Sequence, residues 1–160
     1  MYQKILLGID GSEHSYKAIM KTIEHQKLSK SKVIIFHALE HHAEHIGSIS
    51  MTPAITYRAP QVYYISEPEI QKIKEVYEKN AQVILDRAEE IFREHGIHVE
   101  TRLVFEHDPV TYIKKMVKEE QVDLVIIGSK GNHSLLEEIL LGSVAEKVLR
   151  HVPCDILIVR

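Results

Sequence analysis

Five short apolar runs, separated by longer amphipathic segments, constrain the fold of this chain more than any other feature. The runs cover residues 4–9, 32–38, 97–104, 123–127 and 155–159. Several are apolar at nearly every position, which is typical of strands that are covered on both faces. Strands that alternate with helices predict a parallel, doubly wound α/β sheet, because parallel neighbours need helical crossovers.

Start and stop signals indicate four helices between these strands. The longest is expected to begin at the capping box Ser66-x-x-Glu69, to carry apolar residues at three- and four-residue spacing, and to end at Gly96. The others are expected after Ser12, with a cap from Ser12 or Ser15, after Asp108-Pro109, and after Gly142-Ser143.

Composition limits the class of protein. A chain of 160 residues is expected to form one domain, residues 1–160, and 44% hydrophobic with 27% charged residues is typical of a soluble globular protein. The net charge of -3 argues against a nucleic-acid partner. No leader pattern and no long apolar stretch is visible, so we expect a cytoplasmic protein that does not enter a membrane. The lone cysteine, Cys154, is expected to be a buried, unreactive thiol.

Residues 40–65 show no clear period and are rich in His, Ser, Thr and Pro. A loop of this length in a compact domain is usually functional or disordered, so we expect a mobile insertion beside the site. The array His41, His42 and His45 offers imidazoles that suit Zn, Ni or Cu. A solvated polar loop explains the same residues more simply, and no metal site in the protein is assigned.

Two strand ends carry residues suited to binding. Asp10 follows the first strand, where a carboxylate can accept hydrogen bonds from ribose hydroxyls or help to hold a metal ion, or can simply cap a helix. Gly128-Ser129-Lys130-Gly131 follows the fourth strand, and Gly142-Ser143 opens the last helix. Glycines let backbone N–H groups approach a phosphate, and a helix N-terminus adds free donors. By spacing alone, ordinary turn glycines and an exposed Lys130 side chain are the alternative.

These residues also carry a resemblance to the universal stress protein family. The matching stretches are KILLGIDGSEHS, VIIFHA and IIGSKGNHSLLEEILLGSVAEKVLRHVPCDILIV, which leave out mainly residues 40–65. In that family, G-x-x-G, a spacer of nine residues and G-[ST] mark the members that bind ATP. This chain has ten spacer residues, Asn132 to Leu141. We expect the extra residue to bulge within NHSLLEE and to leave both glycine clusters usable.

The resemblance implies a Rossmann-like sandwich, with a five-stranded parallel sheet in the order 3-2-1-4-5 and helices on both faces. It also implies ATP as the ligand, with Mg²⁺ or Mn²⁺, and a homodimer joined through the last strand, residues 155–159. An apolar edge strand presents unpaired backbone groups that a second chain can satisfy. The implied nucleotide-binding residues are Ile9, Asp10, Ala38, Ile127, Gly128, Gly131, Gly142, Ser143 and Val144, to which Lys130 adds a charge that can neutralise phosphate.

No residue pattern indicates a committed catalyst. The sequence has no G-x-S-x-G elbow and no acidic residue evidently placed to activate water on a γ-phosphate. We therefore expect a nucleotide-dependent binding or switch module in stress response, with at most slow ATP hydrolysis. An interaction module of the same fold without a nucleotide, and an enzyme of adenine-nucleotide chemistry, remain the alternatives.

Overall fold

A computed structural model describes residues 1–39, 66–105, 108–131 and 141–160 of the chain. Within these ranges strands and helices alternate. The strands are β1 (Lys4–Gly8), β2 (Lys32–Leu39), β3 (Glu100–Phe105), β4 (Leu124–Gly128) and β5 (Asp155–Val159). The helices are α1 (Glu13–Ser29), α3 (Glu67–Glu94), α4 (Pro109–Glu120) and α5 (Ser143–His151).

All five strands are parallel and lie in the order β3-β2-β1-β4-β5, which confirms the expected sheet. The central strand, β1, ends at Gly8, which lies opposite Phe36 of β2 and Ile127 of β4. Along the chain, β2 and β3 are added on one side of β1, and β4 and β5 are then added on the other side, so the direction of strand addition reverses between β1 and β4. In such sheets ligands bind outside the carboxyl ends of the strands at this reversal, so β1 and β4 mark the edge to examine.

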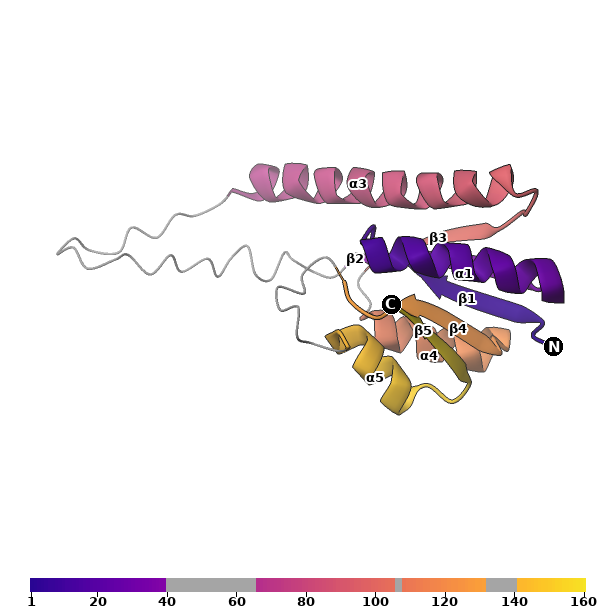
Figure 1. Cartoon of the computed structure of the whole chain (residues 1–160). Coiled ribbons are helices and arrows are strands. Elements are labelled where there is room, and N and C mark those ends of the chain that lie inside the picture. Colours follow the sequence, from indigo (N-terminus) through magenta and orange to yellow (C-terminus); the bar gives the residue numbers. More distant parts are fainter. Residues whose placement is uncertain (40–65, 106–107, 132–140) are drawn as a thin grey trace.

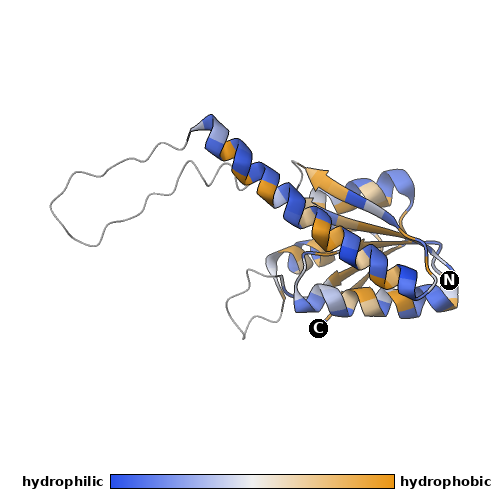
Figure 2. Cartoon of the chain, turned by 90° about the horizontal axis from the view of Figure 1, so that it is seen from above, coloured by the Kyte–Doolittle hydropathy of each residue, from blue (hydrophilic) through white to orange (hydrophobic). Residues whose placement is uncertain are grey.

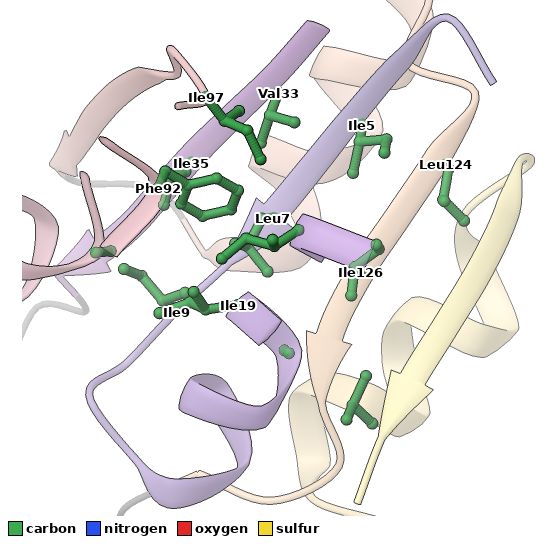
Figure 3. Packing of buried hydrophobic residues seen from close by; sticks show 14 of the residues in the cluster. Ile5, Leu7, Ile9, Ile19, Val33, Ile35, Phe92, Ile97, Leu124 and Ile126 are labelled. Atoms are coloured by element: carbon green, nitrogen blue, oxygen red, sulfur yellow. The ribbon is translucent and has the colours of Figure 1, made fainter. Parts of the chain in front are cut away.

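Helices cover both faces of the sheet, α1 and α3 on one and α4 and α5 on the other (Figure 1). Side chains alternate between the two faces along each strand, so each face has its own apolar cluster. Figure 3 shows the cluster beneath α1 and α3, where Phe92 packs among strand side chains. Each such side chain contributes about 1.5–3 kcal/mol by leaving water. The fully buried aliphatic residues of this cluster include Ile5, Leu7, Ile35 and Ile126.

Capping follows the sequence signals. The Ser12 side chain accepts a hydrogen bond from Ser15 N at 3.1 Å and so caps α1, which settles the choice between Ser12 and Ser15. The capping box of Ser66 and Glu69 is formed at the start of α3. Gly96 has φ +70°, a left-handed conformation in which glycine ends the helix without strain.

Two details differ from the sequence-based expectation. The run 97–104 predicts an extended segment throughout, but β3 begins at Glu100. Ile97 N donates to Phe92 O at 3.0 Å and the Ile97 side chain is buried, so this residue belongs to the turn that ends α3. Cys154 is only half-buried, because it lies in the short turn between α5 and β5. The proposed insertion at 40–65 lies outside the described residues.

Helix α3 extends past the sheet at its N-terminal end (Figures 1 and 2). Its buried residues, Ala81, Leu85, Ala88 and Phe92, all lie in the C-terminal half. Within the described residues, no helix is long and apolar enough to cross a membrane.

Candidate functional site

The turn between β1 and α1 brings a carboxylate to the carboxyl edge of the sheet. Asp10 Oδ1 accepts a hydrogen bond from Ser12 N at 3.0 Å, which fixes the direction of the side chain. Gly11 has φ +77°, a conformation that favours glycine, so the chain can reverse here without strain. The Ser12 hydroxyl then donates to Lys130 O at 3.3 Å. This turn is therefore tied directly to the loop that follows β4.

The loop after β4 approaches α1 too closely for side chains at its glycines. A Cβ at Gly131 would lie 2.7 Å from Asp10 Oδ2, and a Cβ at Gly128 would lie 2.9 Å from the backbone carbon of His14. Contacts below 3.0 Å essentially never occur for real Cβ atoms. At Gly128 the neighbouring atoms include backbone, so packing requires glycine there; at Gly131 the neighbour is the end of the Asp10 side chain, so a side chain at this position would displace the carboxylate.

The second glycine cluster returns to the first. Gly142 N donates to Ser129 O at 2.7 Å, and a Cβ built on Gly142 would lie 3.8 Å from Gly131 N. The ten-residue spacer therefore leaves the two glycine clusters in contact. The bulge expected within NHSLLEE falls outside the described part of the chain. Because the Gly142 N–H is already used, Gly142 offers close backbone approach but no donor.

The N-terminus of α5 supplies donors at the same place. Gly142 is the N-cap residue and has no side chain with which to cap the helix. The first N–H groups of a helix have no partner within the helix, and the helix dipole makes this end favourable for an anion. These groups belong to Ser143, Val144 and Ala145, and the exposed Ser143 adds a hydroxyl. The arrangement suits an anion such as phosphate.

Three of the predicted residues, Ile9, Ala38 and Ile127, lie at the carboxyl ends of β1, β2 and β4 with their side chains buried or half-buried. The Ile9 and Ile127 side chains are buried on opposite faces of the sheet. Ala38 is half-buried on β2, two positions beyond Phe36. His37 Nδ1 lies 2.7 Å from Ile9 O, and since a carbonyl only accepts, this nitrogen carries the proton and donates. His37 therefore fixes the end of β1 next to Asp10.

Two residues that the sequence reasoning missed, His14 and Ser129, lie at the centre of this arrangement. Ser129 Oγ is 2.9 Å from His14 Nδ1, and Ser129 is 1% exposed. Serine in a glycine loop and histidine in the first turn of a helix are common, so neither gave a signal. Only the contact between their side chains shows that both residues belong to this arrangement.

Charges of both signs surround the site. Asp10 and Lys130 lie in the two turns, and Glu13 opens α1. A hydrogen bond from Lys17, at 2.8 Å, holds the pKa of Glu13 below its usual value, so Glu13 stays ionised and paired. Within the described residues, no three His, Cys, Asp or Glu side chains are grouped as metal ligands. His41, His42 and His45 lie outside those residues.

Comparison with known proteins identifies the family. The model of the universal stress protein family matches residues 1–160, and the chain belongs to this family. It is 32% identical over 160 residues to the universal stress protein YxiE of Bacillus subtilis strain 168, with all of both chains covered.

Solved structures of the family have the same architecture. Hypothetical protein MJ0577, the subject of a structure-based assignment of biochemical function, matches with a TM-score of 0.78 and 26% identity, covering 99% of this chain and 96% of the other. A universal stress protein in complex with cAMP matches with a TM-score of 0.61 and 25% identity, covering 99% and 97%. The fold is thus that of a family with at least one member bound to an adenine nucleotide.

Proposed function

We propose that this protein binds ATP, with Mg²⁺ or Mn²⁺, at the carboxyl edge of β1 and β4, and acts as a nucleotide-dependent binding or switch module in stress response. The observation that carries the proposal is the contact between the two glycine clusters. Gly131 lies beside Asp10, and Gly142, the N-cap residue of α5, lies beside Gly131. The family neighbour in complex with cAMP supports an adenine nucleotide.

In this proposal each part of the site has a physical task. The N–H groups of Ser143 and Val144 and the Ser143 hydroxyl donate to phosphate oxygens. Gly128 and Gly131 keep side chains out of the way, and Lys130 supplies positive charge. Asp10, held by the Ser12 N–H, accepts from the ribose hydroxyls or helps to hold the metal ion. The backbone at Ile9, Ala38 and Ile127 faces the base and ribose.

The site favours binding over turnover. A divalent ion would neutralise phosphate charge when it is bound with the nucleotide. Correct positioning of the phosphates then accounts for slow hydrolysis at most. We do not assign a general base in the described residues, and we propose a module that responds to the bound nucleotide.

Titration of the purified protein with ATP by calorimetry tests the proposal, after mass spectrometry of any small molecule released on denaturation. Asp10→Asn should weaken ATP binding about tenfold or more through loss of a charged acceptor. Asp123→Asn is the matched control, because Asp123 accepts from Gln3 N and Lys4 N at the amino edge of the sheet. It should lower stability and leave the affinity for ATP unchanged. A wild-type protein that carries no nucleotide and ignores millimolar ATP would favour the interaction module instead.

We also propose a homodimer that pairs β5 with its two-fold partner in antiparallel orientation. β5 is an edge strand of the sheet, and its apolar residues Ile156, Leu157 and Ile158 are only partly buried in the monomer. Such an edge is a site of aggregation unless it is covered. Sedimentation equilibrium should give the mass of two chains, and a monomer at micromolar concentration would contradict this part of the proposal.

A further inference from the structure

The loop that follows β4 is held by Ser129, which makes one hydrogen bond to each of three elements. Its N–H donates to Val159 O of β5 at 2.7 Å, and its carbonyl accepts from Gly142 N at 2.7 Å. Its hydroxyl meets His14 Nδ1 of α1 at 2.9 Å. The first two bonds use backbone groups that every residue type except proline has. The third is the one that depends on the side chains.

His14 is placed to hold this loop from the side of α1. It lies in the first turn of the helix, and its backbone packs directly against Gly128. The hydrogen bond can be formed in two ways, because the Ser129 hydroxyl can donate to an unprotonated Nδ1 or accept from Nδ1–H. In both cases the imidazole fixes Ser129, and Ser129 fixes Gly142 through its carbonyl.

We propose that His14 is a positioning residue of the site. Through Ser129 it holds the glycine loop and the N-terminus of α5 in the geometry that receives the phosphate groups of the nucleotide. The inference rests on the proposed function, because it concerns the phosphate end of the same site. It adds that the phosphate contribution to affinity depends on a residue of α1 that itself need not contact the ligand.

The proposal separates the phosphate end from the base end. His14 and Ser129 lie on the side of Gly128 and Gly142, whereas the backbone of Ile9 and Ala38 is fixed by β1, β2 and His37. Loss of the His14–Ser129 hydrogen bond should make the position of the groups that donate to phosphate less well defined. It should leave the contacts to the base and the ribose in place. The ratio of the dissociation constants of adenosine and ATP measures this contribution directly.

The experiment is a double-mutant cycle with His14→Ala, Ser129→Ala and the double variant, read by the dissociation constants of Mg-ATP and adenosine. Each single variant should weaken ATP binding about five- to twentyfold, the range for loss of one hydrogen bond, and change adenosine binding less than about twofold. The double variant should be no weaker than the single variants, because both remove the same bond. Losses that multiply in the double variant would overturn the proposal, as would equal losses for ATP and adenosine.

Two substitutions at His14 distinguish positioning from packing. The side-chain amide of Asn reaches about as far as Nδ1, and that of Gln about as far as Nε2. His14→Asn should therefore recover most of the ATP affinity, and His14→Gln should not. Alanine is the better helix former, so His14→Ala should not lower helix stability by propensity. If Asn and Gln behave alike, the bond through Nδ1 is not the cause and the proposal is wrong.

The same measurements distinguish an error in the proposed function from an error in the role of His14. A wild-type protein that binds neither ATP nor adenosine would overturn the proposed function and this inference together. A wild-type protein that binds ATP, with His14→Ala unchanged in affinity, would overturn only the role of His14. Thermal unfolding of each variant shows that the folded protein is being measured.

Discussion

Substitution of Gly131 by alanine is the most direct test of the contact between the two turns. A Cβ at this position would lie 2.7 Å from Asp10 Oδ2, whereas ordinary contact begins at 3.4 Å. The carboxylate must therefore withdraw by about 0.7 Å or the loop must shift. Withdrawal of the carboxylate would disturb the hydrogen bond from Ser12 N to Asp10 Oδ1, now 3.0 Å long, whereas a shift of the loop would disturb the hydrogen bond from the Ser12 hydroxyl to Lys130 O, now 3.3 Å long.

The expected effects on binding and on stability differ in size. A hydrogen bond to a charged group is worth about 1.5–3 kcal/mol, so misplacing the Asp10 carboxylate should weaken ATP binding by about ten- to a hundredfold. The free energy of unfolding should fall less, by about 1 kcal/mol, because alanine restricts the unfolded chain and recovers about 0.4–1 kcal/mol. Calorimetric titration with ATP and thermal unfolding measure the two quantities.

Gly96→Ala is the matched control. Gly96 has φ +70°, and apart from its chain neighbours no atom of the described residues lies within 4 Å of the position that a Cβ would take, so alanine there is strained without a clash. It lies in the turn between α3 and β3, at the opposite edge of the sheet. Stability should fall by about 1–2 kcal/mol with no change in ATP affinity. ATP binding by Gly131→Ala within twofold of wild type would refute a role of this contact in binding, as would an equally strong loss in Gly96→Ala.

Three further predictions concern the rest of the fold. Phe92→Ala should lower the free energy of unfolding by about 3–5 kcal/mol, measured by denaturant titration, because the side chain is fully buried and leaves a cavity. Arg102→Met should cost about 1 kcal/mol at pH 7, because Arg102 Nη1 and Nη2 donate to the two Glu120 carboxylate oxygens at 2.5 and 3.1 Å. Hydrogen bonding to Arg102 holds the pKa of Glu120 below its ordinary value of 4.5, so this stability is present above that pH and is lost as the pH falls through the lower, folded-state pKa. The difference between wild type and Arg102→Met should thus shrink in acid unfolding series, and a constant difference would contradict the assignment. Burial raises the pKa of the Cys154 thiol, so alkylation at pH 7.5 should be at least about tenfold slower in the folded than in the unfolded protein, and equal rates would show an accessible thiol.

Periodicity was enough to predict the strands and a parallel sheet, because strands buried on both faces have few polar positions, whereas the strand order came from the family resemblance. It failed at Ile97, whose apolar side chain is buried by the turn after α3 and not by a strand. In the sequence, an apolar residue that is buried by a tight turn cannot be distinguished from an apolar residue of a strand. Only the hydrogen bond from Ile97 N to Phe92 O distinguishes the two.

The site was partly predictable. Asp10, Gly131 and Gly142 could be placed at one edge of the sheet, because the carboxyl ends of parallel strands meet there. The expectation that the ten-residue spacer leaves both glycine clusters usable came from the match of the residues after the spacer, since the length of a loop does not determine the distance between its ends. The pairing of His14 with Ser129 could not be predicted, because the two residues are 115 positions apart and the G-x-x-G spacing that contains Ser129 gives no information on the partner of its side chain.

The hydrogen bond from Ser129 N to Val159 O joins the glycine loop to an edge strand of the sheet. Any protein surface that pairs with β5 and changes its twist would therefore also change the position of Ser129. If the chain dimerises through β5 as proposed, thermodynamic linkage would make this effect mutual, and a ligand that fixes the loop would alter the affinity of β5 for its partner by the same factor. Under the proposed switch function, this backbone contact between the loop and the edge strand would let a nucleotide in the site affect a molecule paired with β5.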